Sequence, residues 1–297
     1  MNPKSGMTYA LEHFSELARV GIGVSRREVT RGTEKSSPFI HSWDTFDRYL
    51  GICKEFVLFC RNQGVNKLHK LHYDTVEAFL MNKIDKEKVK NTLKVNMCAL
   101  QKFFNGCNRP DLRDQLSDDF PRFKELAKSG STIHAFDNPD RLIEKISNRD
   151  ELSAVIAKLQ HITGARIHEI RIMEIIETTI AINKGKGGRK RVLDFSHRLE
   201  ELAEVKNLVA RLEELAKGIN WKAYCQRKDS PYQGHVKVTC KSLGDSYAGA
   251  HGFRANHAQE LRKKLEAKGL TAEEIELIIT QDLGHNRRSM ARHYLTV

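Results

Sequence analysis

The last forty-odd residues of the chain gather side chains that could act on a phosphate ester. His251 and Arg254 lie three residues apart, His285 follows them, and Tyr294 stands near the end of the sequence. Arginine stays cationic and offers a fork of donors that fits phosphate oxygens, and histidine donates hydrogen bonds or transfers protons near neutral pH. A tyrosine hydroxyl can attack as a nucleophile. These residue types suit cleavage of a phosphodiester especially well.

Two upstream stretches could complete such a site. In the sequence Thr163-Gly-Ala-Arg166-Ile-His-Glu169, the arginine and the glutamate lie three residues apart, so on a helical turn the carboxylate could orient the guanidinium. A basic, glycine-bearing run at 183–191 joins two expected strands, and a lysine there could reach a phosphate or a leaving oxygen. This run lacks the P-loop pattern, so ATP binding is not expected. Taken alone, the first stretch reads as a surface ion pair and the second as a solvated turn.

Composition favours a polyanionic partner. The 297 residues carry 50 Lys and Arg against 38 Asp and Glu, a formal charge of +12, and neutralised phosphates release counterions. The six cysteines show neither metal-ligand nor disulfide-framework spacing and fit a reducing cytosol. The sequence has no apolar run of the roughly 20 residues that span a bilayer, and no signal peptide is expected. We therefore expect a cytoplasmic, nucleoid-associated protein without a membrane partner.

Hydrophobic periodicity predicts two domains. Residues 1–36 are expected to form an N-terminal helix, around 9–20, and a basic arm. Residues 37–127 carry repeated apolar stripes at helical spacing, as in a helix ending at Gly64. Residues 128–144 are rich in turn formers and are predicted to be a linker.

The second predicted domain, 145–297, mixes helices with short strands. Asn148 and Glu151 are expected to cap a helix that ends near Gly164, and Thr271 with Glu274 is expected to cap a later one. β-Branched runs predict strands at 172–176, 179–182 and 192–195, with another short strand at 235–239. Further helices are predicted at 200–217, from His251 and at 286–294.

The ordered motifs resemble those of the tyrosine recombinase family of phage-type integrases and Xer-like site-specific recombinases. They are T-G-A-R-x-x-E at 163–169, G-K-G at 185–187, H-x-x-R at 251–254, L-G-H at 283–285 and a tyrosine nine residues later. The resemblance implies a fold that is mainly α with a small antiparallel β-sheet in the C-terminal domain. It also implies a two-domain DNA clamp, with a helical, SAM-like core-binding domain at 37–127 and a mixed α+β catalytic domain at 145–297.

The same resemblance implies metal-independent and ATP-independent cleavage and rejoining of DNA through a 3′-phosphotyrosine intermediate, with no cofactor. Tyr294 would be the nucleophile, and Lys186 would protonate the leaving 5′-oxygen. The implied catalytic residues are Arg166, Lys186, His251, Arg254, His285 and Tyr294, with Glu169 in a supporting role. Other basic side chains are predicted to contact DNA: Lys184, Arg189, Lys190, Arg191, Arg287 and Arg288. The implied partners are a double-stranded recombination site, further copies of the chain from dimer to tetrameric synapse, and accessory DNA-bending or directionality proteins.

Several alternatives remain open at the level of sequence. A type IB topoisomerase uses a similar residue set, and a non-catalytic DNA-binding accessory protein could retain the same fold. Lys184 and Lys190 compete with Lys186 as the general acid. Tyr247 is a second nucleophile candidate, although its position before H-x-x-R fits no pattern of the family.

Overall fold

The structure is a computed structural model that describes residues 6–17, 29, 37–86, 90–128, 134–185, 189–227, 229–249, 251–285 and 288–295. The chain divides into two compact units, Met1–Ser131 and Thr132–Val297. The border falls inside the stretch that the sequence predicts to be a linker. Within the described residues no helix is long and apolar enough to cross a membrane.

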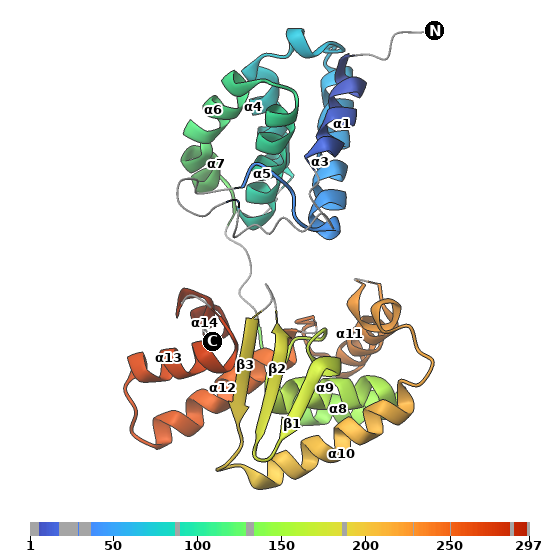
Figure 1. The fold of residues 1–297 in the computed structure, drawn as a ribbon, viewed down its shortest axis with the longest axis vertical. Coiled ribbons are helices and arrows are strands. Elements are labelled where there is room, and N and C mark those ends of the chain that lie inside the picture. Colours follow the sequence, from blue (N-terminus) through green and yellow to red (C-terminus); the bar gives the residue numbers. More distant parts are fainter. Residues whose placement is uncertain are drawn as a thin grey trace. The chain divides into compact units, whose positions relative to one another are not determined.

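The first unit is a helical bundle (Figure 1). Its described helices are α1 (Gly6–Glu16), α3 (Trp43–Asn62), η1 (Leu68–Lys70), α4 (Tyr73–Asp85), α5 (Lys90–Gly106), α6 (Pro110–Asp118) and α7 (Phe120–Leu126). The Ser42 side chain caps α3 by accepting a hydrogen bond from the amide of Thr45. Phe56 makes edge-to-face contacts with Phe79, Phe103 and Phe104. The aromatic side chains of this unit therefore build its core.

Helix α1 corrects the expected domain boundary at residue 37. Met7, Ala10 and Phe14 are buried in the core of the first unit, and α1 packs on α3 and α5. An amphipathic helix buries its apolar stripe wherever a core accepts it, so this helix belongs to the bundle. The basic segment that follows, with Arg26, lies outside the described residues.

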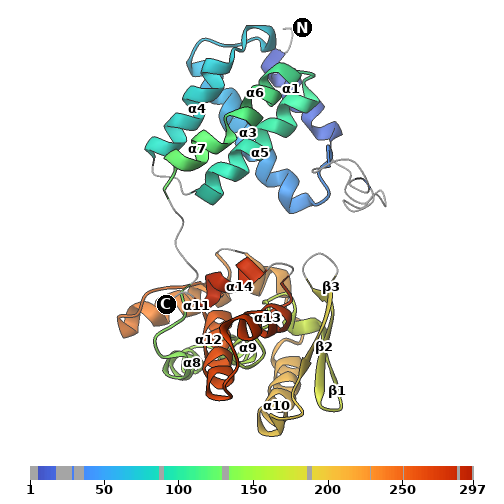
Figure 2. The same ribbon diagram turned by 90° about the vertical axis from the view of Figure 1, so that its left-hand side faces the viewer.

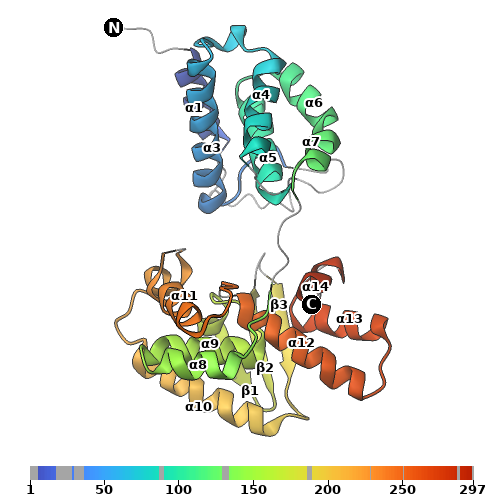
Figure 3. The same ribbon diagram turned by 180° about the vertical axis from the view of Figure 1, so that it is seen from behind.

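The second unit combines helices with one small sheet. Its described elements are α8 (Pro139–Ser147), α9 (Glu151–Thr163), η2 (Ile170–Ile172), β1 (Met173–Ile176), β2 (Thr179–Gly185), β3 (Arg189–Asp194), α10 (Leu199–Leu215), η3 (Lys222–Gln226), α11 (Pro231–Leu243), α12 (His251–Ala267), α13 (Ala272–Asp282) and α14 (Arg288–Leu295). Helix α9 is central, because α8, α10 and α12 all pack against it, as seen from behind in Figure 3. Its side chains are buried along most of its length.

The three strands form an antiparallel sheet in the order β1-β2-β3. Met173 pairs with Ile182, and Ile180 pairs with Leu193. Because side chains alternate across a strand, Ile180 and Leu193 enter the core while Val192 is exposed. Figure 2 shows the sheet at one side of the unit, with the helices beside one of its faces. The mainly α fold with a small antiparallel sheet and the three predicted strands are confirmed.

Three local predictions are wrong. The expected strand at 235–239 lies inside α11, which begins with Pro231 in its first turn and ends at Gly244 with a φ of 77°. Part of the predicted linker is α8, whose Leu142 and Ile146 are buried. Asp150, not Asn148, caps α9 by accepting a hydrogen bond from the amide of Ser153. The predicted capping box of Thr271 and Glu274 is present.

Candidate active site

The site begins where α9 ends. Gly164 takes a φ of 59° and terminates the helix, a conformation that glycine adopts without steric cost. The chain then turns so that Arg166 and Glu169 face each other. Glu169 accepts one hydrogen bond from the Arg166 amide at 2.9 Å and another from its guanidinium at 2.7 Å. The turn therefore fixes both the backbone and the side chain of Arg166.

Glu169 is the anionic centre of the site. It is completely buried, and besides Arg166 it accepts a hydrogen bond from Arg191 at 2.9 Å. Burial alone raises the pKa of the carboxyl group, but the charge of Arg191 and the hydrogen bonds and charge of Arg166 outweigh burial and bring the pKa to about 2. Glu169 is thus ionised at neutral pH and orients two guanidinium groups.

Arg191 lies inside the site, which corrects its expected role as a DNA contact. It projects inward from β3 and is buried. One guanidinium nitrogen donates to Glu169, and another donates to the backbone carbonyl of Asp282. A buried side chain held on two sides cannot grip a DNA backbone at the surface. Side chains alternate between the two faces of a strand, and Arg191 lies on the face of β3 that points toward the core.

Arg254 is the most deeply placed cation. It is completely buried on α12, and it donates hydrogen bonds to the backbone carbonyls of Gly164 and Leu283. Among the described residues it makes no ion pair, and its Nε has no hydrogen-bond partner. Burial and the charges of Arg166 and Arg191 lower its pKa to about 10, so it remains cationic at neutral pH.

His285 lies next to Arg254 in the site. Burial, together with the charges of Arg254, Arg166 and Arg191, lowers the pKa of its imidazole to about 3, so the ring is neutral. An Arg254 nitrogen lies 3.2 Å from its Nε2, and because a guanidinium only donates, Nε2 must accept. The proton therefore resides on Nδ1. That atom is buried and has no partner among the described residues.

Tyr294 packs against these two side chains. Its ring centroid lies 5.3 Å from that of His285, and the Arg254 guanidinium carbon lies 5.6 Å from the Tyr294 ring centroid. The side chain is 4% exposed and belongs to a small cluster of α12, α13 and α14 residues. Among the described residues its hydroxyl makes no hydrogen bond. The tyrosine thus lies beside the guanidinium and the imidazole with its hydroxyl unengaged.

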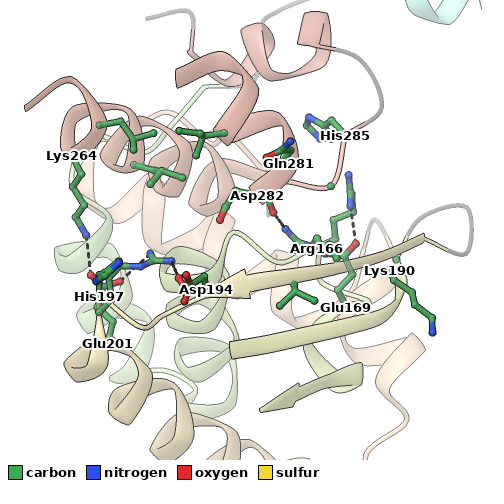
Figure 4. A pocket seen from close by; sticks show the side chains of 18 of the residues that line it. Arg166, Glu169, Lys190, Asp194, His197, Glu201, Lys264, Gln281, Asp282 and His285 are labelled. Carbon is green, nitrogen blue, oxygen red and sulfur yellow. Dashed lines mark hydrogen bonds and ion pairs between the residues drawn. The ribbon is translucent and has the colours of Figure 1, made fainter. Parts of the chain in front are cut away.

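A cavity of about 1220 Å³ opens beside this cluster. Arg166, Glu169 and His285 line one part of it, and Figure 4 shows them on the same side. Its other walls come from β3 and from the facing sides of α12 and α13. In the described part of the chain, no three His, Cys, Asp or Glu side chains are grouped to hold a metal ion.

Comparison with known proteins relates this geometry to a family. No protein-family model matches the chain. The tyrosine recombinase XerC of Bacillus pumilus (strain SAFR-032) is 24% identical over 185 residues, which are 59% of this chain and 59% of that protein. This chain therefore covers less than two thirds of that relative's length.

Solved structures share the fold over nearly the whole chain. A lambda integrase dimer bound to a COC' core site matches with a TM-score of 0.60 and 15% identity, covering 97% of this chain and 77% of that one. The Tn1549 transposon integrase in complex with circular intermediate DNA matches with a TM-score of 0.53 and 12% identity, covering 97% and 95%. The chain is thus similar in sequence to a tyrosine recombinase and shares the fold of two integrases.

The structure brings most of the expected catalytic residues together. The assembled residues are Arg166, Glu169, Arg254, His285 and Tyr294. His251 lies at the first residue of α12, exposed, one helical turn before Arg254. Lys186 and Arg287 lie outside the described residues, and the side chains of Lys184 and Arg189 are not described.

The remaining candidate residues that the structure describes lie at the surface. Lys190 is exposed at the rim of the cavity and points away from Arg166 (Figure 4). Arg288 is exposed at the start of α14. The hydroxyl of Tyr247 donates to Gln233, whereas Tyr294 lies against Arg254. Of the two tyrosines, Tyr294 is therefore the one that lies beside the arginine cluster.

The sequence analysis missed two residues of the candidate site. His257 is buried one turn beyond Arg254 on α12, and its Nε2 lies 2.7 Å from the carboxylate of Asp282. The signal was available, because His257 extends the H-x-x-R motif by a further step of three and Asp282 directly precedes L-G-H. Spacing alone did not reveal that the two meet.

Proposed function

We propose that this protein is a site-specific DNA recombinase that cleaves and rejoins strands through a 3′-phosphotyrosine intermediate. The observation that carries the proposal is the buried Arg254, whose partners among the described residues are backbone carbonyls and a neutral imidazole. A buried cation without a carboxylate is costly unless an anion joins it. The scissile phosphate is the anion that the neighbouring tyrosine and the family both suggest.

Binding of the phosphate uses the arginines first. Arg166 and Arg254 donate to the non-bridging oxygens, and Glu169 keeps Arg166 in position. The Nδ1 proton of His285, which has no partner among the described residues, supplies a further donor. These donors are already oriented, so they stabilise the charge that develops on the oxygens without reorganisation.

Strand transfer then exchanges one ester for another. The Tyr294 hydroxyl gives its proton to His251 and its oxygen bonds to phosphorus, while the bond from phosphorus to the 5′-oxygen breaks. Lys186 protonates that leaving oxygen. The product is a 3′-phosphotyrosine and a free 5′-hydroxyl, and attack by a second 5′-hydroxyl reverses the steps to rejoin DNA.

The proposed partners follow from the substrate. A lambda integrase dimer bound to a core site and a lambda integrase tetramer bound to a Holliday junction have the same fold, which supports double-stranded DNA and self-association on it. Lys190 and Arg288 are exposed and suit contacts to the DNA backbone. A chromosomal substrate would place the protein in the cytoplasm, at the nucleoid.

Covalent capture tests the proposal. Wild type, Tyr294→Phe and Tyr247→Phe are incubated in EDTA with nicked duplexes drawn from DNA flanking the gene, then denatured. We expect a protein–DNA adduct at the 3′ side for wild type and Tyr247→Phe, and none for Tyr294→Phe. Arg166→Ala should bind the duplex and yield at least about 100-fold less adduct. Adduct from Tyr294→Phe, or undiminished adduct from Arg166→Ala, would contradict the assignment.

A further inference from the structure

His257 makes two hydrogen bonds that together require a proton on each of its ring nitrogens. It is buried on α12, its Nδ1 lies 3.1 Å from the backbone carbonyl of His161, and its Nε2 lies 2.7 Å from Oδ2 of Asp282. A carbonyl oxygen only accepts, and so does an ionised carboxylate. Both ring nitrogens must then donate, which an imidazolium does and a neutral imidazole cannot.

The lowered pKa of the Asp282 carboxyl group agrees with an ionised Asp282, and part of that lowering comes from His257 itself. Burial raises the pKa of this carboxyl group, but the charge and hydrogen bond of His257 and the charges of Arg191 and Arg198 outweigh burial, and the pKa is lowered. The pair therefore holds one proton more than a neutral histidine beside an aspartate would. That proton lies between the side chains of His257 and Asp282, which are 5% and 12% exposed.

Asp282 is the first residue of the turn that binds Arg191 and Arg254. Its backbone carbonyl accepts from Arg191, and the carbonyl of Leu283 accepts from Arg254. Two residues later His285 accepts from Arg254 at 3.2 Å. Any shift of this turn moves three groups that orient the guanidinium groups. The bond from His257 fixes the first residue of the turn by its side chain.

His257 also contacts the other segment that holds Arg254. That segment is Gly164, whose carbonyl accepts from Arg254. A Cβ added to Gly164 would lie 2.5 Å from Cδ2 of His257, so the imidazole packs directly on this glycine. The two carbonyls that bind Arg254 thus belong to segments that both rest against one histidine.

We propose that His257, with a proton on each ring nitrogen and bound to Asp282, is a positioning residue that sets the spacing of the two carbonyls bound by Arg254. This inference rests on the proposed function. A neutral His257 would keep only one donor, and one of its two hydrogen bonds would become a contact between acceptors. The turn and Arg254 then lose their fixed spacing.

Charged groups surround the pair from each neighbouring element. On α12 the carboxylate of Glu260 faces it, and on α9 His161 bonds to Glu260 at 2.7 Å. Arg191 from β3 and Arg198 at the start of α10 act on Asp282. Both ring nitrogens of His257 bond to groups other than Glu260, so Glu260→Gln serves as a nearby control that leaves both hydrogen bonds of His257 in place.

The Asp282→Asn variant distinguishes a neutral His257 from a protonated one. An asparagine amide can donate to Nε2, so a neutral His257 with its proton on Nδ1 would keep both hydrogen bonds. We expect ring-¹⁵N spectra of the full-length chain to show His257, identified by its absence from His257→Gln, with both nitrogens protonated at neutral pH. In Asp282→Asn the same ring should show one protonated nitrogen. These spectra need no DNA, so they test the pair even if the proposed function fails.

Cleavage rates on nicked duplexes test the positioning role. At neutral pH, Asp282→Asn should be about fivefold slower than wild type, because a charge-assisted bond is replaced by a neutral one. His257→Gln should be at least about tenfold slower at every pH, with DNA binding retained, and Glu260→Gln should follow wild type. A neutral His257 ring in wild type, or a cleavage rate of His257→Gln equal to that of wild type, overturns the proposal.

Discussion

Replacing Glu169 by glutamine tests whether the arginine cluster is held by one ionised carboxylate. Glu169 is completely buried between Arg166 and Arg191, and glutamine has nearly the same shape without the charge. At neutral pH the variant leaves a buried guanidinium without its anion. Breaking a buried ion pair in this way costs about 3 kcal/mol or more. We therefore expect Glu169→Gln to be less stable than wild type by about 3 kcal/mol at pH 7.

The pH dependence of that difference follows from the pKa of Glu169. The pKa is about 2 in the folded protein against an ordinary 4.5, which corresponds to about 3 kcal/mol in favour of the ionised form. Because the folded-state pKa is the lower one, this stabilisation is complete well above pH 4.5 and is lost as the pH falls towards 2. The linkage relation gives a loss of about 2 kcal/mol by pH 3. Glutamine does not titrate, so the gap between the proteins narrows to about 1 kcal/mol.

Urea unfolding followed by fluorescence measures this gap. The chain has two tryptophans, and Trp43 lies exposed in the first unit while Trp221 packs in the second. A Trp43→Phe background leaves Trp221 to report the unit that holds the site. Glu213→Gln, at an exposed position of α10, is the matched control and should differ little from wild type at any pH. A gap for Glu169→Gln that stays constant within about 0.5 kcal/mol from pH 6 to pH 3 would refute the reasoning.

Two further substitutions probe the same site. Gly164→Ala should lower the free energy of unfolding by about 2 to 4 kcal/mol in urea, because φ is 59° and the new Cβ would lie 2.5 Å from His257. Gly218→Ala, with φ of 78° and nothing within 4 Å of the added Cβ, should cost only about 1 kcal/mol, and equal losses would contradict the contact. Arg254→Lys should reduce adduct formation at least about 100-fold while DNA binding persists, because an ammonium cannot reproduce the planar fork between Gly164 and Leu283. Adduct formation within a few-fold of wild type would show that charge alone suffices.

Much of the fold could be read from local patterns. The helix that ends at Gly164 and the capping box of Thr271 and Glu274 depend on residues within a few positions of one another, and both are present. The three strands followed from β-branched runs. The segment at 235–239 shows the limit of this approach, because its alternating side chains suit a strand but lie inside a helix started by Pro231. There the neighbouring stop and start signals outweigh a five-residue pattern.

For the site, the amino-acid sequence alone shows which reactive side chains are present and in what order they follow along the chain. Arg166 and Glu169 are three residues apart, and their hydrogen bonds follow from one turn of backbone. The tertiary structure decided which other side chains join them. Arg191 enters the site because the pleat of β3 points it inward, and His257 meets Asp282 because α12 packs beside α13. These contacts join residues 22 and 25 positions apart. Spacing within one element cannot predict them, because they depend on how separate elements pack.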